Sequence, residues 1–313
     1  MTVTAPARPT PGARPSGDAS LLDPAVLARI GGLELIARAV VDGFLGGLHR
    51  APTLGASTDF AEHRAYLPGD DPRRVDWRLY ARTDRLHVKE FEADTNASVT
   101  VLLDVSKSMD FGRDGRPTKL HYARMLAASL LWLARQQRDR VGLLTFDSAV
   151  REYVPPSGKH LPLALHALER ARAGGPGELT APLRASAELF RRRGLVVVIS
   201  DLYAEPAEAL DAVAQLRNRG NELLLLQVLD PAERDLPLDD TTGLRDLETG
   251  DALPVVPKAA RAQYRALLDA HLAALEVEAR ARGVLYGLFD TGTPLDAALF
   301  RYLAARQRLE HRR

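Results

Sequence analysis

Short apolar runs alternate with amphipathic stretches from about residue 98 to the C-terminus. The runs are typical of buried strands, and they lie at residues 99–103, 140–146, 195–200, 222–229 and 284–289. Between them, apolar residues recur at helical spacing, which predicts helices at residues 119–137, 160–172, 181–193, 205–217 and 259–282 and a last helix from residue 294. Strands that alternate with helices predict an α/β fold with a doubly wound, mostly parallel sheet.

The same pattern also predicts an edge strand, the end of one helix, the apolar face of another helix and an insertion. The short run at residues 150–154 follows the strand at 140–146 so closely that we expect it to pair antiparallel at one edge of the sheet. The three arginines at 191–193 are expected to close the helix at 181–193, because positive charge suits the negative end of a helix dipole. In the helix at 259–282, one apolar face is expected to hold Tyr264, Leu267, Leu268, His271, Leu272 and Leu275. Residues 230–258 read as an insertion that contains a hairpin turning at Thr249-Gly250-Asp251.

The chain divides into three parts. Residues 1–20, rich in Pro, Ala, Thr and Gly, lack the apolar core of a secretory signal and predict a disordered arm. Residues 21–97 hold a helix and a highly charged region, and residues 98–313 form the α/β domain. The helix at residues 33–48 is short for a membrane span and carries Glu34, Arg38 and Asp42 at four-residue spacing, so we expect it to pack in the protein rather than act as an anchor.

Composition narrows the classes of function. Lys and Arg number 42 against 41 acidic residues, so no overall field attracts nucleic acid or an anionic membrane. The absence of Cys excludes disulfides, thiolate zinc sites and thiol nucleophiles. It also fits a reducing compartment, and we expect a cytoplasmic protein.

Polar side chains follow the predicted strands at the edge where ligands bind in open α/β sheets. Asp104, Ser106 and Ser108 come directly after the strand at 99–103, and Asp201 follows the strand at 195–200. Thr180 stands in a further loop at the same end. Two carboxylates and three hydroxyls form an all-oxygen set that suits a hard divalent cation such as Mg²⁺. Each residue alone could instead be a helix cap or an ordinary strand-end residue.

These residues resemble the metal-ion-dependent adhesion site of the von Willebrand factor A domain, and the resemblance covers residues 99 to about 303. The D-x-S-x-S motif of that family falls on Asp104, Ser106 and Ser108, its threonine on Thr180 and its later aspartate on Asp201. The resemblance implies a Rossmann-like sheet and a site for Mg²⁺, Mn²⁺ or Ca²⁺. It also implies that the open coordination position takes a carboxylate from a protein partner.

A second resemblance lies in residues 60–94, which are similar to the signature of the bacterial family called domain of unknown function 58. The matching positions are Arg64, Tyr66, Gly69, Asp70, Asp71, Arg73, Asp76, Trp77, Ala81 and Arg82. This resemblance implies partnership with a MoxR-type AAA+ ATPase in the assembly or remodelling of client proteins. The region itself could be a solvated connector or, as we favour, an accessory layer on the sheet anchored by Tyr66 and Trp77.

Two other classes of function stay open as alternatives. A metal-dependent phosphatase-like hydrolase would use the strand-end aspartate as a nucleophile, but the dehalogenase type needs a second Asp where this chain has Ser106. No P-loop lysine motif occurs either, so we expect no enzyme. A nucleic-acid-binding module could use the arginines of residues 64–85, and salt-sensitive binding that ignores EDTA would identify it.

Overall fold

The computed structural model describes residues 23–29, 31–50, 63–65, 80, 82, 85, 87–89, 97–113, 115–190, 193–236, 243–245, 252–254 and 257–311. The arm at 1–20, most of the signature region with Tyr66 and Trp77, and the hairpin turn at 249–251 lie outside the described residues.

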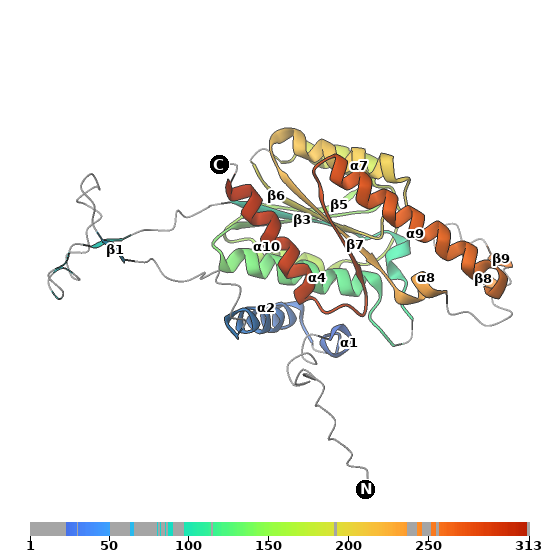
Figure 1. Ribbon diagram of the computed structural model, residues 1–313, viewed down its shortest axis with the longest axis horizontal. Coiled ribbons are helices and arrows are strands. Elements are labelled where there is room, and N and C mark those ends of the chain that lie inside the picture. The colour runs from blue at the N-terminus through green and yellow to red at the C-terminus, as the bar shows by residue number, and fades with distance from the viewer. Residues whose placement is uncertain are drawn as a thin grey trace, which may run out of the picture.

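A six-stranded sheet forms the centre of the α/β domain (Figure 1). Its strands are β3 (Ser98–Asp104), β4 (Arg140–Phe146), β5 (Val150–Ser157), β6 (Gly194–Ser200), β7 (Glu222–Leu229) and β10 (Leu285–Asp290), in the order β10-β7-β6-β3-β4-β5. All neighbours run parallel except β5, which is antiparallel to β4 at the edge. The predicted α/β fold of von Willebrand factor A type, with one antiparallel edge strand, is confirmed.

Helices cover both faces of the sheet because each strand alternates its side chains between two cores. On one face, Val99, Val101 and Leu103 of β3 belong to a core shared with helices α2 (Leu33–Arg50), α4 (Lys119–Gln136), α5 (Leu161–Arg170) and α10 (Asp296–His311). On the other face, Leu102 belongs to a core shared with helices α6 (Thr180–Ala187), α7 (Pro206–Gln215) and α9 (Pro257–Ala281). The continuous apolar runs of β6 and β7 reflect burial on both faces.

Helix α2 is a packing helix, as its polar stripe predicts. Ile36, Val40 and Phe44 are buried in the core shared with α4. On the outer face, Arg38 Nε lies 3.6 Å from Asp42 Oδ2 across one turn. Within the described parts of the chain, no helix combines the length and apolar character that crossing a membrane requires.

Two expectations about helices are wrong. Helix α6 ends at Ala187, well before the three arginines at 191–193, so these do not close it. The chain leaves the helix there because Phe190 turns into the core with Leu183, and the Leu189 N–H bonds to the Ser186 carbonyl in a tightened last turn. In α9, Leu267 is 65 % exposed rather than part of the buried face, whereas Leu275 is fully buried.

Short elements complete the described chain. Two separate two-stranded antiparallel sheets pair β1 (His63–Ala65) with β2 (His87–Lys89), and β8 (Gly243–Arg245) with β9 (Ala252–Pro254) in a hairpin. The β8–β9 hairpin is the one predicted in the insertion. Short helical segments are α1 (Pro24–Leu27), η3 (Lys107–Asp110), η4 (Leu216–Arg219) and α8 (Pro231–Asp235). Strand β7 leads directly into α8, which marks the carboxyl end of the parallel strands on the right of Figure 1.

Candidate functional site

The loop after β3 holds its aspartate in a fixed orientation. Asp104 is buried, and its two carboxylate oxygens accept different hydrogen bonds. The Ser106 N–H donates to Oδ1 at 2.8 Å, and the Ser200 hydroxyl, from the end of β6, donates to Oδ2 at 2.6 Å. The Ser106 and Ser108 hydroxyl oxygens lie 3.1 Å apart. One carboxylate and two hydroxyls therefore gather within a single turn of chain.

Asp201 lies at the end of β6, which pairs with β3 in parallel register, so the two aspartates end neighbouring strands. Both side chains are buried. Burial, followed by the negative charge of Asp201, raises the pKa of Asp104 from 3.8 to about 6. The two carboxylates are therefore close enough to repel each other at neutral pH.

The turn after Asp201 is held by unusual backbone geometry. Leu202 has a φ of +57°, in the left-handed region that a residue with a side chain seldom adopts. The Leu202 N–H donates to the Ser200 hydroxyl at 3.1 Å, and Gln227 Nε2 donates to the Asp201 carbonyl at 2.8 Å. Such strain is kept where surrounding contacts over-determine the conformation, and here these two hydrogen bonds hold the backbone on both sides of Asp201.

A lysine that the sequence analysis missed is part of this site. Lys119, the first residue of α4, is fully buried. Its Nζ donates to Asp201 Oδ2 at 2.8 Å and to Glu233 Oε1 at 2.7 Å, and it lies 4.7 Å from the centre of the Tyr203 ring. Burial by itself lowers the pKa of Lys119, but the two carboxylates outweigh burial and raise it. The ammonium is therefore charged and shared between two acids.

Glu233 brings α8 into the same cluster. Asp230 and Glu233 form a capping box, in which the Ala232 N–H donates to Asp230 Oδ1 at 2.8 Å and the Asp230 N–H donates to Glu233 Oε2 at 2.9 Å. Burial raises the pKa of Glu233, and the Lys119 charge opposes that shift. The Tyr264 hydroxyl of α9 donates to the Glu233 carbonyl at 2.7 Å. Helix α8, and through it α9, is thus connected to the Asp201 side chain through Lys119.

Both missed residues carried a signal in the sequence. A lysine at the first position of a helix opposes the dipole, which favours acids there, so Lys119 calls for a specific partner. Asp230 and Glu233 have the three-residue spacing of a capping box beside Pro231.

The loop that leads to Thr180 lies against the loop after β3. The Gly174 N–H donates to the Val105 carbonyl at 3.0 Å, and the Lys107 N–H donates to the Gly175 carbonyl at 2.9 Å. Thr180 follows as the first residue of α6. Among the hydrogen bonds between described residues, none joins the Thr180 hydroxyl to the two aspartates or the two serines. The structure thus brings the segment near, while a role for the Thr180 side chain stays a prediction.

The donor set fits a divalent cation. Three carboxylic side chains, Asp104, Asp201 and Glu233, stand against the one ammonium of Lys119, so the cluster has more acidic groups than basic ones. If all three are ionised, its net charge is −2. In the described part of the chain, no three acidic or histidine side chains form a metal-binding group by themselves. The serine hydroxyls would therefore have to complete a cation site, as they do in oxygen-rich Mg²⁺ sites that keep bound water.

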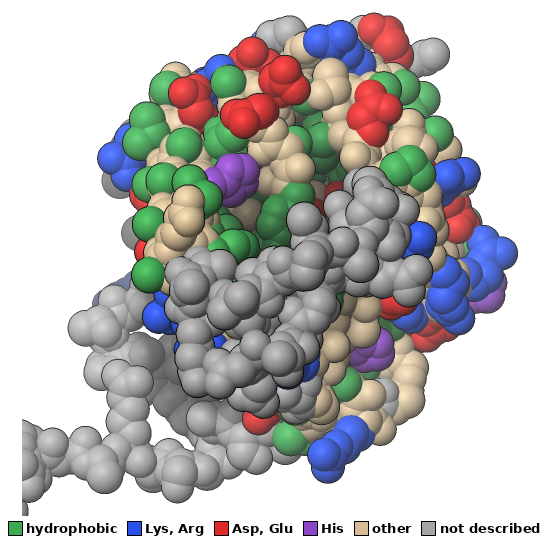
Figure 2. All heavy atoms as spheres, turned by 90° about the vertical axis from the view of Figure 1, so that its right-hand side faces the viewer, with side chains coloured by type: hydrophobic (Ala, Val, Ile, Leu, Met, Phe, Trp, Pro, Cys, Tyr) green, Lys and Arg blue, Asp and Glu red, His purple; other side chains and the backbone are tan. Residues whose placement is uncertain are grey.

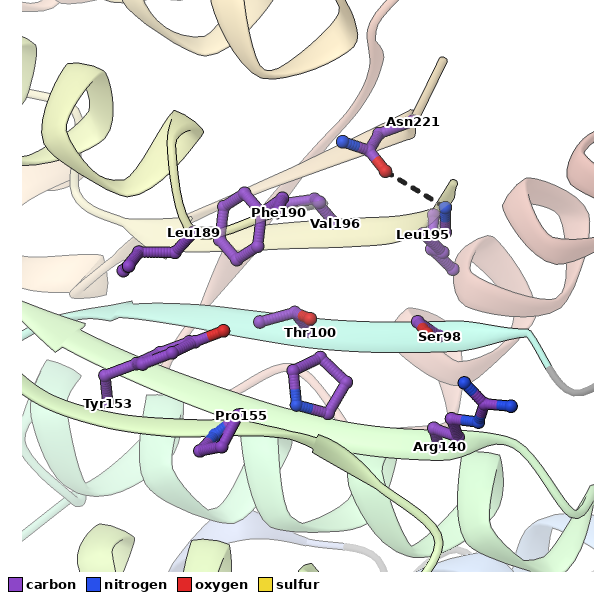
Figure 3. Close-up of a pocket in the computed structure, with 12 residues that line it drawn as sticks. Ser98, Thr100, Arg140, Tyr153, Pro155, Leu189, Phe190, Leu195, Val196 and Asn221 are labelled. Atoms are coloured by element: carbon purple, nitrogen blue, oxygen red, sulfur yellow. Dashed lines mark hydrogen bonds between the residues drawn. The ribbon is translucent and has the colours of Figure 1, made fainter. Parts of the chain in front are cut away.

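Figure 2 looks onto this end of the molecule, where acidic side chains gather along the upper part and basic ones along the right margin. The opposite end holds a cavity of about 330 Å³, lined by Ser98, Thr100, Tyr153, Phe190 and Asn221 among others. Figure 3 shows the Asn221 side chain reaching the Gly194 N–H, a bond of 3.0 Å, while Leu189 and Phe190 face Tyr153 across Thr100. This cavity lies at the amino ends of β3 and β6, away from both aspartates.

Comparison with known proteins places the chain in a family. The family model described as "Protein of unknown function DUF58" matches residues 62–274, more than half of the chain. The chain belongs to the DUF58 family. Uncharacterised proteins of Mycobacterium tuberculosis and Mycobacterium bovis are each 32 % identical to this DUF58 protein over 294 residues, which cover 91 % of both chains.

Solved structures similar to this DUF58 protein include two from Bacteroides. An aerotolerance-related membrane protein of Bacteroides fragilis is 19 % identical with a TM-score of 0.47, covering 69 % of this chain and 99 % of that one. The conserved hypothetical protein BatB of Bacteroides thetaiotaomicron is 18 % identical with a TM-score of 0.45, covering 68 % of this chain and 99 % of that one.

Proposed function

We propose that this DUF58 protein is a metal-dependent adaptor that binds a carboxylate of a protein partner at the end of β3 and β6. The observation that carries the proposal is the pair of buried carboxylates, Asp104 and Asp201, beside two adjoining serine hydroxyls. Two like charges buried on neighbouring strands are unfavourable, and Lys119, which pairs with Asp201 and Glu233, offsets only part of the negative charge. A site with this excess of negative charge is suited to bind a divalent cation.

In this proposal, Asp104, Ser106, Ser108, Thr180 and Asp201 hold the ion, which is Mg²⁺, Mn²⁺ or Ca²⁺. The bound ion would offer an open position to an incoming carboxylate, and a charge-assisted contact in a partly dehydrated site fixes both partner and orientation. Neighbouring residues hold the two carboxylates in fixed orientations. Ser200 and the Ser106 N–H hold the Asp104 carboxylate, and Lys119 holds that of Asp201.

The same contacts favour binding over catalysis. Both oxygens of Asp104 accept hydrogen bonds, which stabilise the carboxylate and weaken it as a nucleophile. The position two residues later, where a dehalogenase-type phosphatase has its general acid, is Ser106. We therefore propose that the protein acts through binding and is not an enzyme.

The proposed partner is a MoxR-type AAA+ ATPase, on the basis of the resemblance in the signature region, and the pair would act in the assembly or remodelling of client proteins. The test is biolayer interferometry between the immobilised protein and a purified MoxR-type ATPase of the same organism. EDTA also removes Mg²⁺ from the nucleotide site of the ATPase, so the decisive comparison uses Asp104→Asn at constant Mg²⁺.

Asp110→Asn is the matched control, because Asp110 is an exposed carboxylate in the same loop. We expect the wild type and Asp110→Asn to bind alike and Asp104→Asn to lose binding. Equal binding by all three proteins would refute a role for the cation site in this partnership.

A further inference from the structure

A second pocket lies directly beside the proposed cation site. It has a volume of about 420 Å³, within the usual range for ligand pockets. Its lining includes Val105, the residue between Asp104 and Ser106, and Gly174 and Gly175, which bond to the loop after β3. The pocket and the cation site therefore share one wall, and an extended ligand could occupy both.

Three arginines line this pocket, which we call the arginine pocket: Arg151 from β5, Arg170 from the end of α5, and Arg172 from the loop that follows. Two have acidic partners in the lining. Arg151 Nε lies 2.6 Å from Asp147 Oδ2, and Arg170 Nη2 lies 2.8 Å from Glu152 Oε1. Three positive charges against two negative ones leave the lining with one unbalanced positive charge.

The unbalanced charge belongs to Arg172. Its Nη1 donates to the carbonyls of Glu169 at 2.7 Å and Ala171 at 2.9 Å. No carboxylate pairs with Arg172 among the residues that the structure describes. A guanidinium has five N–H donors in a fork that matches a carboxylate. Arg172 therefore keeps donors for a ligand while its position is fixed from one side.

A second cation behind the pocket strengthens this field. Arg124 of α4 donates from Nη2 to the same Glu169 carbonyl at 3.0 Å, so two guanidinium groups converge on one oxygen. Burial, and then the charge of Arg172, lower the pKa of Arg124, while the nearby Glu169 carboxylate opposes that shift. Its Nε is buried and bonds to nothing in the described parts of the chain. Arg124 thus adds positive charge behind the pocket, while the donors that can reach a ligand are those of Arg172.

We infer that the arginine pocket binds a carboxylate side chain of an acidic protein segment whose neighbouring carboxylate lies at the cation site. This inference rests on the proposed adaptor function and specifies its partner: a segment with at least two closely spaced Asp or Glu residues. Nucleic acid fits less well, because Asp147 and Glu152 stand in the lining and none of the described lining residues is aromatic.

Fluorescence anisotropy with a labelled Gly-Asp-Gly-Asp-Gly-Asp peptide, and with its Asn counterpart, tests the inference. Arg172→Gln removes the unbalanced charge. Arg280→Gln is the matched control, because Arg280 is an exposed arginine of α9 at the other side of the sheet. In Mg²⁺ we expect Arg172→Gln to weaken binding of the Asp peptide about tenfold or more, the usual effect of losing a charge-assisted hydrogen bond. We expect no change in the control and no binding of the Asn peptide.

The outcomes separate the two proposals. If EDTA abolishes binding and Arg172→Gln does not weaken it, the arginine pocket is refuted and the cation site stands. If Arg172→Gln weakens binding and EDTA has no effect, the pocket stands and the proposed metal dependence fails. Tighter binding of a labelled oligothymidylate than of the Asp peptide overturns the choice of an acidic protein segment. Should loss of the Arg172 carbonyl bonds unfold the variant, Arg170→Gln serves in its place, because that side chain is 60 % exposed.

Discussion

Replacing Lys119 by Met should make the stability of the protein depend more strongly on added metal. The change removes the ammonium but keeps an unbranched apolar stem of similar length. Asp201 and Glu233 lose their shared partner at 2.8 and 2.7 Å. With all three carboxylates ionised, the net charge of the cluster changes from −2 to −3.

The magnitude follows from the burial of the ion pair. Removing one partner of a buried salt bridge costs about 3–5 kcal/mol. Glu233 can take up a proton, since burial already raises its pKa, so we expect the lower end of that range. At roughly 2–4 °C per kcal/mol for a domain of this size, the melting temperature in EDTA should fall by about 6–12 °C.

The assay is thermal unfolding by circular dichroism in EDTA and in millimolar Mg²⁺. Because the variant site is more negative, Mg²⁺ should raise its melting temperature more than that of the wild type. Lys119→Arg keeps the charge, and Lys159→Met alters an exposed lysine in a distant loop as a control. An equal loss of stability in Mg²⁺ and EDTA, or no loss at all, would show that the ammonium and the cation do not share this site.

Three further predictions concern neighbouring contacts. Since the pKa of Asp104 is raised from 3.8 to about 6, its contribution to stability is complete below pH 4 and is lost as the pH rises through 6, roughly 3 kcal/mol in all. Melting in EDTA should therefore show the wild type gaining stability from pH 7.5 to pH 5 relative to Asp104→Asn, and parallel profiles would contradict this. Tyr286→Phe removes a 2.5 Å hydrogen bond to Gln227 Oε1, and urea unfolding should show a loss of about 1–3 kcal/mol; an unchanged midpoint would mean that water replaces the hydroxyl. Gly175→Ala places a methyl group 2.7 Å from Asp147 Oδ2, so we expect a loss of about 1–3 kcal/mol by the same method, and a neutral effect would show that the loop yields.

The strands could be predicted from the sequence because they are buried on both faces. β4 and β7 have the predicted limits, 140–146 and 222–229, since continuous apolar runs between polar turns leave little choice of register. The same regularity places Asp104 and Asp201 together at the carboxyl ends of β3 and β6, because parallel neighbouring strands end on the same side of the sheet. The positions of these two aspartates could therefore be predicted from local hydrophobic patterns and from the rule that ligands bind at the carboxyl ends of parallel strands.

Other features depend on contacts between distant parts of the chain. Lys119 reaches Asp201 across 82 positions and Glu233 across 114, and no local pattern connects three such residues. Helix α6 ends early because Phe190 enters the core, although its local sequence favours a longer helix. Tertiary packing decides these cases over local propensity.

In the proposed function, Asp104, Ser106, Ser108, Thr180 and Asp201 bind a divalent cation. The most direct measurement is isothermal titration of Mg²⁺ into the EDTA-dialysed wild type, Asp104→Asn and Asp110→Asn. We expect saturable binding at one site by the wild type and Asp110→Asn, and none by Asp104→Asn. Absence of binding by the wild type, or equal binding by Asp104→Asn, would contradict it.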